Sequence, residues 1–144
     1  YHNARLAVHE AKLDGYDGAL MLTPDDYVSE APIACFFMVR DGKLITPSCS
    51  SNILESVTRD TIITRYQETT GHQVEQRSVD RSELYFADEA FLCGTGQEII
   101  PVTSIDHFSV GDGSIGPITE NIRQDYFNIV RNPNADHTEW RTLV

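Results

Sequence analysis

The spacing of apolar residues predicts three helices along the chain. The first runs from His2 to Leu13 and ends before Asp14-Gly15. The second begins near Val57 or Thr58, after a polar loop, and ends before Gly71. The third begins at Pro117, because proline suits the first turn of a helix. Its predicted apolar stripe comprises Ile118, Ile122, Tyr126 and Val130.

Short apolar runs between these helices predict β-strands. The strongest hairpin signal joins residues 35–40 to residues 43–46 through Asp41-Gly42, because Asp-Gly readily adopts the positive φ angles of a tight turn. A second hairpin, between residues 19–23 and 27–30, is less well specified because its turn lacks glycine. Further strands are predicted at 74–79, 89–93 and 99–105, and a short helix capped by Asp80 or Ser82 is predicted at 81–87.

Composition indicates one globular domain. The chain has 144 residues, of which 40% are hydrophobic, and we assign residues 1–131 to the domain and 132–144 to a polar tail that Trp140 could anchor. The formal net charge of -11 would repel nucleic acid and acidic membranes. No segment reaches the roughly 20 apolar residues of a membrane span, and no signal peptide is evident at the N-terminus, so we expect a cytoplasmic protein.

Cysteine and histidine patterns argue against a disulfide framework and a metal site. The cysteines, Cys35, Cys49 and Cys93, are odd in number and lack CxxC spacing, so we expect buried or half-buried thiols. The histidines form neither HxH nor HExxH. The sequence also lacks the GxSxG, GxGxxG and P-loop patterns.

Three features could bind a ligand, and each also has an ordinary structural explanation. The start of the second helix, Ser56-Val57-Thr58, could seat a phosphate at the positive end of the helix dipole, or could simply cap the helix. Gly94-Thr95-Gly96 could let a ligand approach the backbone, or could be a plain turn. Glu30 could be functional, or could be a solvated charge at the end of a strand.

Taken together, several motifs resemble the class IV aminotransferases, the fold-type IV pyridoxal phosphate (PLP) enzymes. The motifs follow one another in family order: Glu30, Phe36-Phe37, Leu44-Ile45-Thr46, residues 54–59 and Gly94-Thr95-Gly96. Within the family the chain looks most like branched-chain amino-acid aminotransferases, given GYDGALML, RDGKLITP, ILESVTRD, ADEAFLCGTGQEIIPV and GDGSIGPIT. The resemblance runs from Tyr1 to about Val130. It implies an α/β (α+β) fold: the large C-terminal domain of these enzymes, a mixed-strand pseudo-barrel with surrounding helices.

The resemblance also implies a PLP site and roles for individual residues. Glu30 matches the glutamate that pairs with the protonated pyridine nitrogen and keeps the ring able to accept electrons. Ser56, Val57 and Thr58 match the helix start that binds the cofactor phosphate. The turn of Thr95 and Gly96 matches residues beside the phosphate and the substrate carboxylate. Tyr1 matches a tyrosine that hydrogen-bonds the phenolic oxygen of the cofactor.

The sequence departs from the family in two places. The lysine that forms the Schiff base precedes the tyrosine matched by Tyr1 and is not in this sequence, and neither Lys12 nor Lys43 matches it. The small N-terminal domain is also absent, so we expect it to lie in a missing segment or in a partner chain. Near Glu30, Ala31-Pro32-Ile33-Ala34-Cys35 stands where relatives have small residues and then asparagine, so the substrate preference stays open.

The leading hypothesis is therefore PLP-dependent transamination between a branched-chain amino acid and 2-oxoglutarate. A D-amino-acid transaminase, an (R)-amine transaminase or an aminodeoxychorismate lyase would share the fold. An alternative of another class is a non-catalytic fragment that packs against a partner chain. By analogy with the family, we expect self-association into a dimer or larger oligomer.

Overall fold

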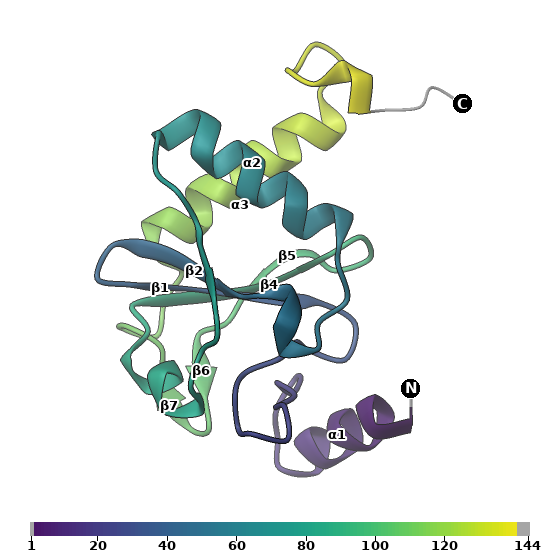
Figure 1. The fold of residues 1–144 in the computed structure, drawn as a ribbon, viewed down its shortest axis with the longest axis vertical. Helices are drawn as coiled ribbons and strands as arrows, with labels where there is room; N and C mark the ends of the chain where they lie inside the picture. The colour runs from purple at the N-terminus through teal and green to yellow at the C-terminus, as the bar shows by residue number, and fades with distance from the viewer. Residues whose placement is uncertain (1, 141–144) are drawn as a thin grey trace.

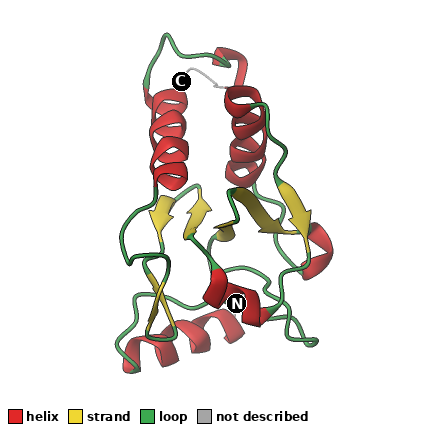
Figure 2. Cartoon of the chain, turned by 90° about the vertical axis from the view of Figure 1, so that its left-hand side faces the viewer, coloured by secondary structure: helices red, strands yellow, loops and turns green. Residues whose placement is uncertain are grey.

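The computed structural model describes residues 2–140 and consists of layers built around one sheet (Figure 1). Two long helices, α2 (Val57–Thr70) and α3 (Pro117–Arg131), cover one face of the sheet. The short hairpin of β6 (Ser104–Ile105) and β7 (Phe108–Ser109) lies on the other side, where α1 (His2–Leu13) is also found. Figure 2 shows the same separation after a quarter turn.

The central sheet is mixed, as the family resemblance predicted. Its strands are β1 (Cys35–Arg40), β2 (Lys43–Pro47), β3 (Glu75–Arg77), β4 (Glu89–Gly94) and β5 (Glu98–Pro101). Their spatial order is β3-β2-β1-β4-β5, in which β2 and β3 are parallel and the other neighbours antiparallel. Among residues 2–140, β3 and β5 remain edges, so strand pairing alone does not close this sheet into a barrel.

The hairpin between β1 and β2 forms as predicted. Asp41 has a φ of 52° and Gly42 a φ of 71°, which are the positive values that the Asp-Gly turn was expected to adopt. Arg40 therefore pairs with Lys43 across the turn.

Strand β1 is apolar over most of its length because both of its faces are buried. Phe37 lies in the core on the helix side of the sheet, where its ring stacks on Phe91 with centroids 5.0 Å apart. Phe36 and Met38 belong to the second core, which includes Val79. Successive side chains of a strand point to opposite faces, so a strand covered on both sides reads as a continuous apolar run.

The helices match their predicted ranges, but two details of their packing differ. Helix α1 has no buried residue, and Leu6 and Leu13 are 66% and 75% exposed. In α3 the predicted stripe ends wrongly at Val130, which is 41% exposed, whereas Ile129 is 3% exposed. With 3.6 residues per turn, position 129 completes the face begun by Ile122.

Several weaker elements also differ from expectation. The hairpin predicted between residues 19 and 30 forms over a shorter stretch, in which Leu22 bridges Val28 and backbone hydrogen bonds join Met21 to Glu30 and Ser29. Residues 81–87 form a 3-10 helix, η2 (Arg81–Phe86), and not an α-helix, with Asp80 accepting from the Ser82 N–H at 2.8 Å. The strand predicted at 99–105 is divided between β5 and β6.

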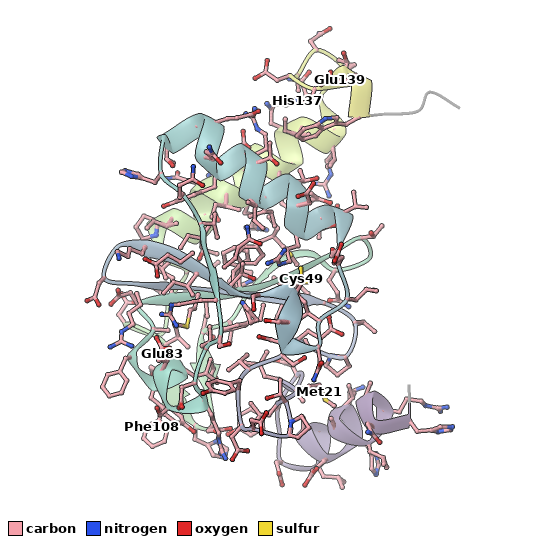
Figure 3. The ribbon with its side chains drawn as sticks, in the orientation of Figure 1. Met21, Cys49, Glu83, Phe108, His137 and Glu139 are labelled. Atoms are coloured by element: carbon pink, nitrogen blue, oxygen red, sulfur yellow. The ribbon has the colours of Figure 1, made fainter. Side chains whose placement is uncertain are left out.

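Polar segments complete the chain. The 3-10 helix η1 (Cys49–Ser51) follows β2, and Cys49 is exposed, contrary to the expectation of a covered thiol (Figure 3). In the tail, η3 (Thr138–Trp140) contains Trp140, which stacks on His137 with ring centroids 3.8 Å apart. His137 contacts Glu68 of α2 at 2.9 Å, so the predicted anchoring of the tail runs through this histidine.

Residues 2–140 contain neither a membrane-spanning helix nor a metal-binding cluster. The helices in this part of the chain are all too short or too polar to cross a membrane. The same residues contain no group of three or more His, Cys, Asp or Glu side chains that could hold a metal ion.

A partly buried ion-pair cluster ties η2 to the sheet. Glu83 accepts from Arg77 at 2.7 and 2.8 Å and from Arg40 at 2.9 Å, and Figure 3 shows it on the side of the sheet away from α2. These charge-assisted hydrogen bonds, that from Arg77 foremost, lower the pKa of Glu83 from 4.5 to about 2. The ionised carboxylate is therefore part of the folded structure.

We expect Glu83→Gln to lower the free energy of unfolding at pH 7 by about 2 kcal/mol. Because the folded pKa lies below the ordinary value, the stabilisation is present above pH 4.5 and is lost as the pH falls toward 2. Urea unfolding at several pH values between 7 and 2 measures this. Glu10→Gln, on the exposed α1, is the control with little effect. A pH-independent difference between Glu83→Gln and wild type would contradict the prediction.

The N-terminus of α2 gives a second stability prediction. Ser56 has extended backbone angles, and its Oγ accepts from the Arg59 N–H at 3.3 Å. We expect Ser56→Ala to cost about 1 kcal/mol, because the N–H loses its acceptor, while Ser56→Asp should retain most of the stability. Thermal melting compares the three proteins. Equal melting temperatures for wild type and Ser56→Ala would show that the cap does not stabilise α2.

Candidate functional site

Three segments meet at one end of the sheet: the turn after Glu30, the start of α2, and the turn between β4 and β5. Figure 1 shows the start of α2 and the β4–β5 turn on its right-hand side. Cys35 pairs with Cys93, which brings the beginning of β1 beside the end of β4. A Cβ on Gly94 would lie 3.1 Å from the Ile33 carbonyl oxygen, so glycine allows the two turns to approach closely.

Glu30 is held at this end of the sheet by backbone hydrogen bonds. Its carbonyl accepts from the Met21 N–H at 2.8 Å, and its Oε2 accepts from the Leu54 N–H at 2.9 Å. The side chain is half-buried, and within residues 2–140 its Oε1 has no hydrogen-bond partner. The carboxylate is therefore oriented by the loop before α2 and can still accept a hydrogen bond from a cationic N–H group.

The start of α2 provides unpaired backbone donors. Val57 is 82% exposed, whereas Thr58, the next residue of the helix, is buried, with 4% exposed. In the described part of the chain, the N–H groups of Val57 and Thr58 have no acceptor, while the next N–H, of Arg59, is capped by Ser56. Free N–H groups at the positive end of a helix dipole favour an anion.

Thr95 and Gly96 lie in the turn between β4 and β5, and both are exposed. The Thr95 hydroxyl has no hydrogen-bond partner among residues 2–140, so it remains available to a ligand. A Cβ on Gly96 would meet nothing within 4 Å. Glycine is therefore required at Gly94, where the backbone at Ile33 comes close. At Gly96 a side chain would clash only with a bound ligand, because no described residue beyond its two chain neighbours comes within 4 Å of a Cβ there.

A pair of thiols connects these segments, which the sequence did not reveal. The Cys35 thiol donates to the Leu54 carbonyl at 3.5 Å, so Leu54 contacts both Cys35 and Glu30. The neighbouring Cys93 thiol foremost, and to a smaller extent the Ser56 hydroxyl, lower the pKa of Cys35 despite its burial. The proximity of Cys35 and burial raise the pKa of Cys93. Cys35, noted as a departure from the family asparagine, thus supports the loop that orients Glu30.

The second residue that sequence reasoning missed is Arg59, which is 5% exposed. Its Nη2 donates to the Pro47 carbonyl at 3.1 Å and to Gln76 Oε1 at 3.0 Å. In the sequence, the one indication that Arg59 belongs to the site was its place in ILESVTRD, next to the predicted phosphate-binding residues. Its burial depends on contacts with two strands far away in the sequence.

The structure therefore gathers most of the predicted residues. Glu30 and Cys35 are both hydrogen-bonded to Leu54, in the loop that leads to Ser56, and Thr95-Gly96 follows the strand that pairs with Cys35. Tyr1 lies outside the described residues. Lys43 is at the far end of the β1–β2 hairpin, where it pairs with Glu75 at 2.8 Å. One carboxylate acceptor near free backbone donors suits a ligand with a cationic N–H group and an anionic group.

Comparison with known proteins agrees with this chemistry. The family model described as amino-transferase class IV matches residues 1–105. A probable branched-chain-amino-acid aminotransferase of Aquifex aeolicus is 44% identical over all 144 residues, which correspond to 46% of that protein. The chain thus spans about half the length of the curated relatives it matches.

Solved structures give the same result. A branched-chain amino acid aminotransferase from Thermobaculum terrenum, in its PLP form, matches 99% of this chain and 46% of its own, with a TM-score of 0.95 and 49% identity. A branched-chain amino acid aminotransferase from T.th., complexed with N-(5'-phosphopyridoxyl)-L-glutamate, matches 99% of this chain and 48% of its own, with a TM-score of 0.91 and 36% identity. With a family model that matches well over half of its residues, this chain belongs to the class IV aminotransferases.

Proposed function

We propose that this chain is the cofactor-binding C-terminal part of a PLP-dependent aminotransferase that transfers an amino group between a branched-chain amino acid and 2-oxoglutarate. The observation that carries the proposal is the position of the Glu30 carboxylate at the same end of the sheet as the open N-terminus of α2. The names of the relatives, which include PLP and phosphopyridoxyl-glutamate complexes, support the choice of cofactor and substrate.

The residues present fit PLP at both of its charged ends. The free N–H groups of Val57 and Thr58 suit a phosphate, and the Thr95 hydroxyl can add a hydrogen bond to it. The unpaired Glu30 Oε1 suits a protonated pyridine nitrogen. When bound, PLP supplies an electron sink for the electron pair left behind as the substrate α-hydrogen departs.

In this proposal each side chain has a defined task. Glu30 holds a proton on the pyridine nitrogen, and the Leu54 N–H keeps its carboxylate in place. Ser56 caps α2 and so sets the direction of the first N–H groups. Thr95 and the backbone at Gly96 bind the substrate carboxylate. Tyr1, outside the described residues, hydrogen-bonds the phenolic oxygen of the cofactor.

The remaining parts of the site are assigned to the rest of the enzyme. The lysine that carries the cofactor and the small N-terminal domain are expected in the half of the relatives' length that this chain does not span. Ile33, Leu54 and Val57 are 71%, 73% and 82% exposed, and such apolar side chains around a site are expected where further protein covers them. A dimeric or larger assembly remains a prediction from the family resemblance, and a cytoplasmic location remains a prediction from the sequence pattern.

We expect Glu30→Gln in the complete enzyme to reduce kcat by about 100-fold, equivalent to ~2.7 kcal/mol, because a neutral amide no longer holds the proton on the ring. PLP binding should persist, since the phosphate contacts remain. Steady-state kinetics and the absorbance of the bound cofactor measure the two effects. Glu55→Gln is the matched control, because Glu55 is exposed and close to Leu54 in the same loop. Unchanged turnover in Glu30→Gln would exclude the assigned role.

A panel of amino donors tests the substrate. We expect the complete enzyme, incubated with PLP, to show the absorbance of lysine-bound cofactor and to transfer amino groups from leucine, isoleucine and valine to 2-oxoglutarate. Transfer only from D-amino acids or (R)-amines, or lyase activity on aminodeoxychorismate, would replace the proposed substrate within the same fold. A complete protein without cofactor absorbance would support the non-catalytic alternative.

A further inference from the structure

Arg59 is a buried cation without a carboxylate partner. It lies in the first turn of α2 and is 5% exposed, and within residues 2–140 it forms no ion pair with an Asp or Glu. Its Nη2 donates to two neutral oxygens, those of Pro47 and Gln76, and its Nε is buried without a partner. The positive charge is therefore uncompensated by the described residues.

Such an arrangement is unfavourable unless an anion binds nearby. A buried charge is normally paired, because removal from water costs several kcal/mol. The first turn of a helix is moreover the positive end of its dipole, where a cation is disfavoured. An anion bound at the N-terminus of α2 would offset both the cost of burying the Arg59 charge and its unfavourable interaction with the helix dipole.

Elsewhere in the fold, a positive helix end and a partly buried arginine are each paired with a carboxylate. Helix α3 receives the buried Glu89 carboxylate at its start, with the Ile118 and Thr119 N–H groups donating at 3.1 and 2.6 Å. Arg65, further along α2, forms two hydrogen bonds to Asp125 at 2.9 and 3.0 Å. The start of α2 combines a positive helix end with an unpaired arginine. The acidic residue of this turn, Asp60, is exposed, and among the described residues no buried carboxylate accepts from the N–H groups of Val57 and Thr58.

The position of Arg59 connects its charge to the site. Its hydrogen bonds join the first turn of α2 to the end of β2 and to β3. The pKa of Cys35 is lowered first by the neighbouring Cys93 thiol, and also by the Ser56 hydroxyl and the positive charge of Arg59. The positive charge of Arg59 thus acts on the Cys35 thiol, which donates to the Leu54 carbonyl in the loop before α2.

We propose that Arg59 is a positioning residue for the cofactor phosphate, which raises phosphate affinity through its uncompensated charge and holds the first turn of α2 in place from beneath. This inference rests on the proposed function, because it assumes that PLP is the ligand. Arg59 does not touch the phosphate in this role. It acts through the orientation and the potential of the N–H groups of Val57 and Thr58.

The test compares PLP with pyridoxal, which lacks the phosphate, as ligands of the complete enzyme freed of cofactor. We expect Arg59→Gln to raise the Kd for PLP about tenfold, because one unit charge is lost near a dianion, and to change the Kd for pyridoxal less than about twofold. Glutamine retains a donor for the Pro47 carbonyl. Absorbance titration of both ligands gives the ratio of the two constants.

Two variants serve as controls. Arg59→Lys keeps the charge and should keep the PLP-to-pyridoxal ratio near that of wild type. Arg65→Gln removes an arginine of the same helix whose charge is already paired, and it should lower stability without changing the ratio.

The outcomes separate this proposal from the proposed function. An unchanged ratio in Arg59→Gln, an equal loss in Arg65→Gln, or an unfolded Arg59→Gln protein would overturn the positioning role and leave Arg59 as a structural residue. Failure of the wild-type enzyme to bind PLP at all would instead overturn the proposed function. A selective loss of PLP affinity in Arg59→Gln, restored in Arg59→Lys, supports the proposal.

Discussion

The antiparallel pairing of β1 with β4 is the constraint on which the rest of the structure depends. It sets Phe37 against Phe91 in one core and, through the alternation of side chains, directs Phe36 and Met38 into the other. The same register places Cys35 beside Cys93. A slip of one residue would exchange the two cores and move the Thr95-Gly96 turn away from Glu30. Core packing and site geometry are therefore specified by one set of strand contacts.

The two long helices satisfy their N-termini in different ways. For α3, a carboxylate from β4 enters the first turn, and Gly116 leaves room for it, because a Cβ there would lie within the Glu89 side chain. For α2, the cap is the neutral Ser56, and the buried charge in its first turn is the cationic Arg59. The start of α3 is thus already occupied by a carboxylate from another element of this chain, whereas the start of α2 retains the capacity to bind an anion.

The Glu30 segment shows how a departure from a family pattern can keep its structural function. Cysteine cannot replace the hydrogen bonds of an asparagine amide. Here the Cys35 thiol still donates to the Leu54 carbonyl, and the Leu54 N–H donates to Glu30. The support of the glutamate thus passes mainly through the backbone of the 52–56 loop. Backbone support depends little on the side chain that happens to occupy each position.

The sequence by itself determined the long elements, the Asp41-Gly42 hairpin and the family, because these depend on local periodicity, turn chemistry and short motifs. Local motifs also singled out Glu30, Ser56-Val57-Thr58 and Thr95-Gly96 as candidate site residues. Only the tertiary structure decided that Ile129 and not Val130 is buried, that Cys35 and Cys93 pair across neighbouring strands, and that Arg59 is buried without an ion pair among the described residues. These properties arise from strand order and from contacts between distant segments, which local patterns do not encode.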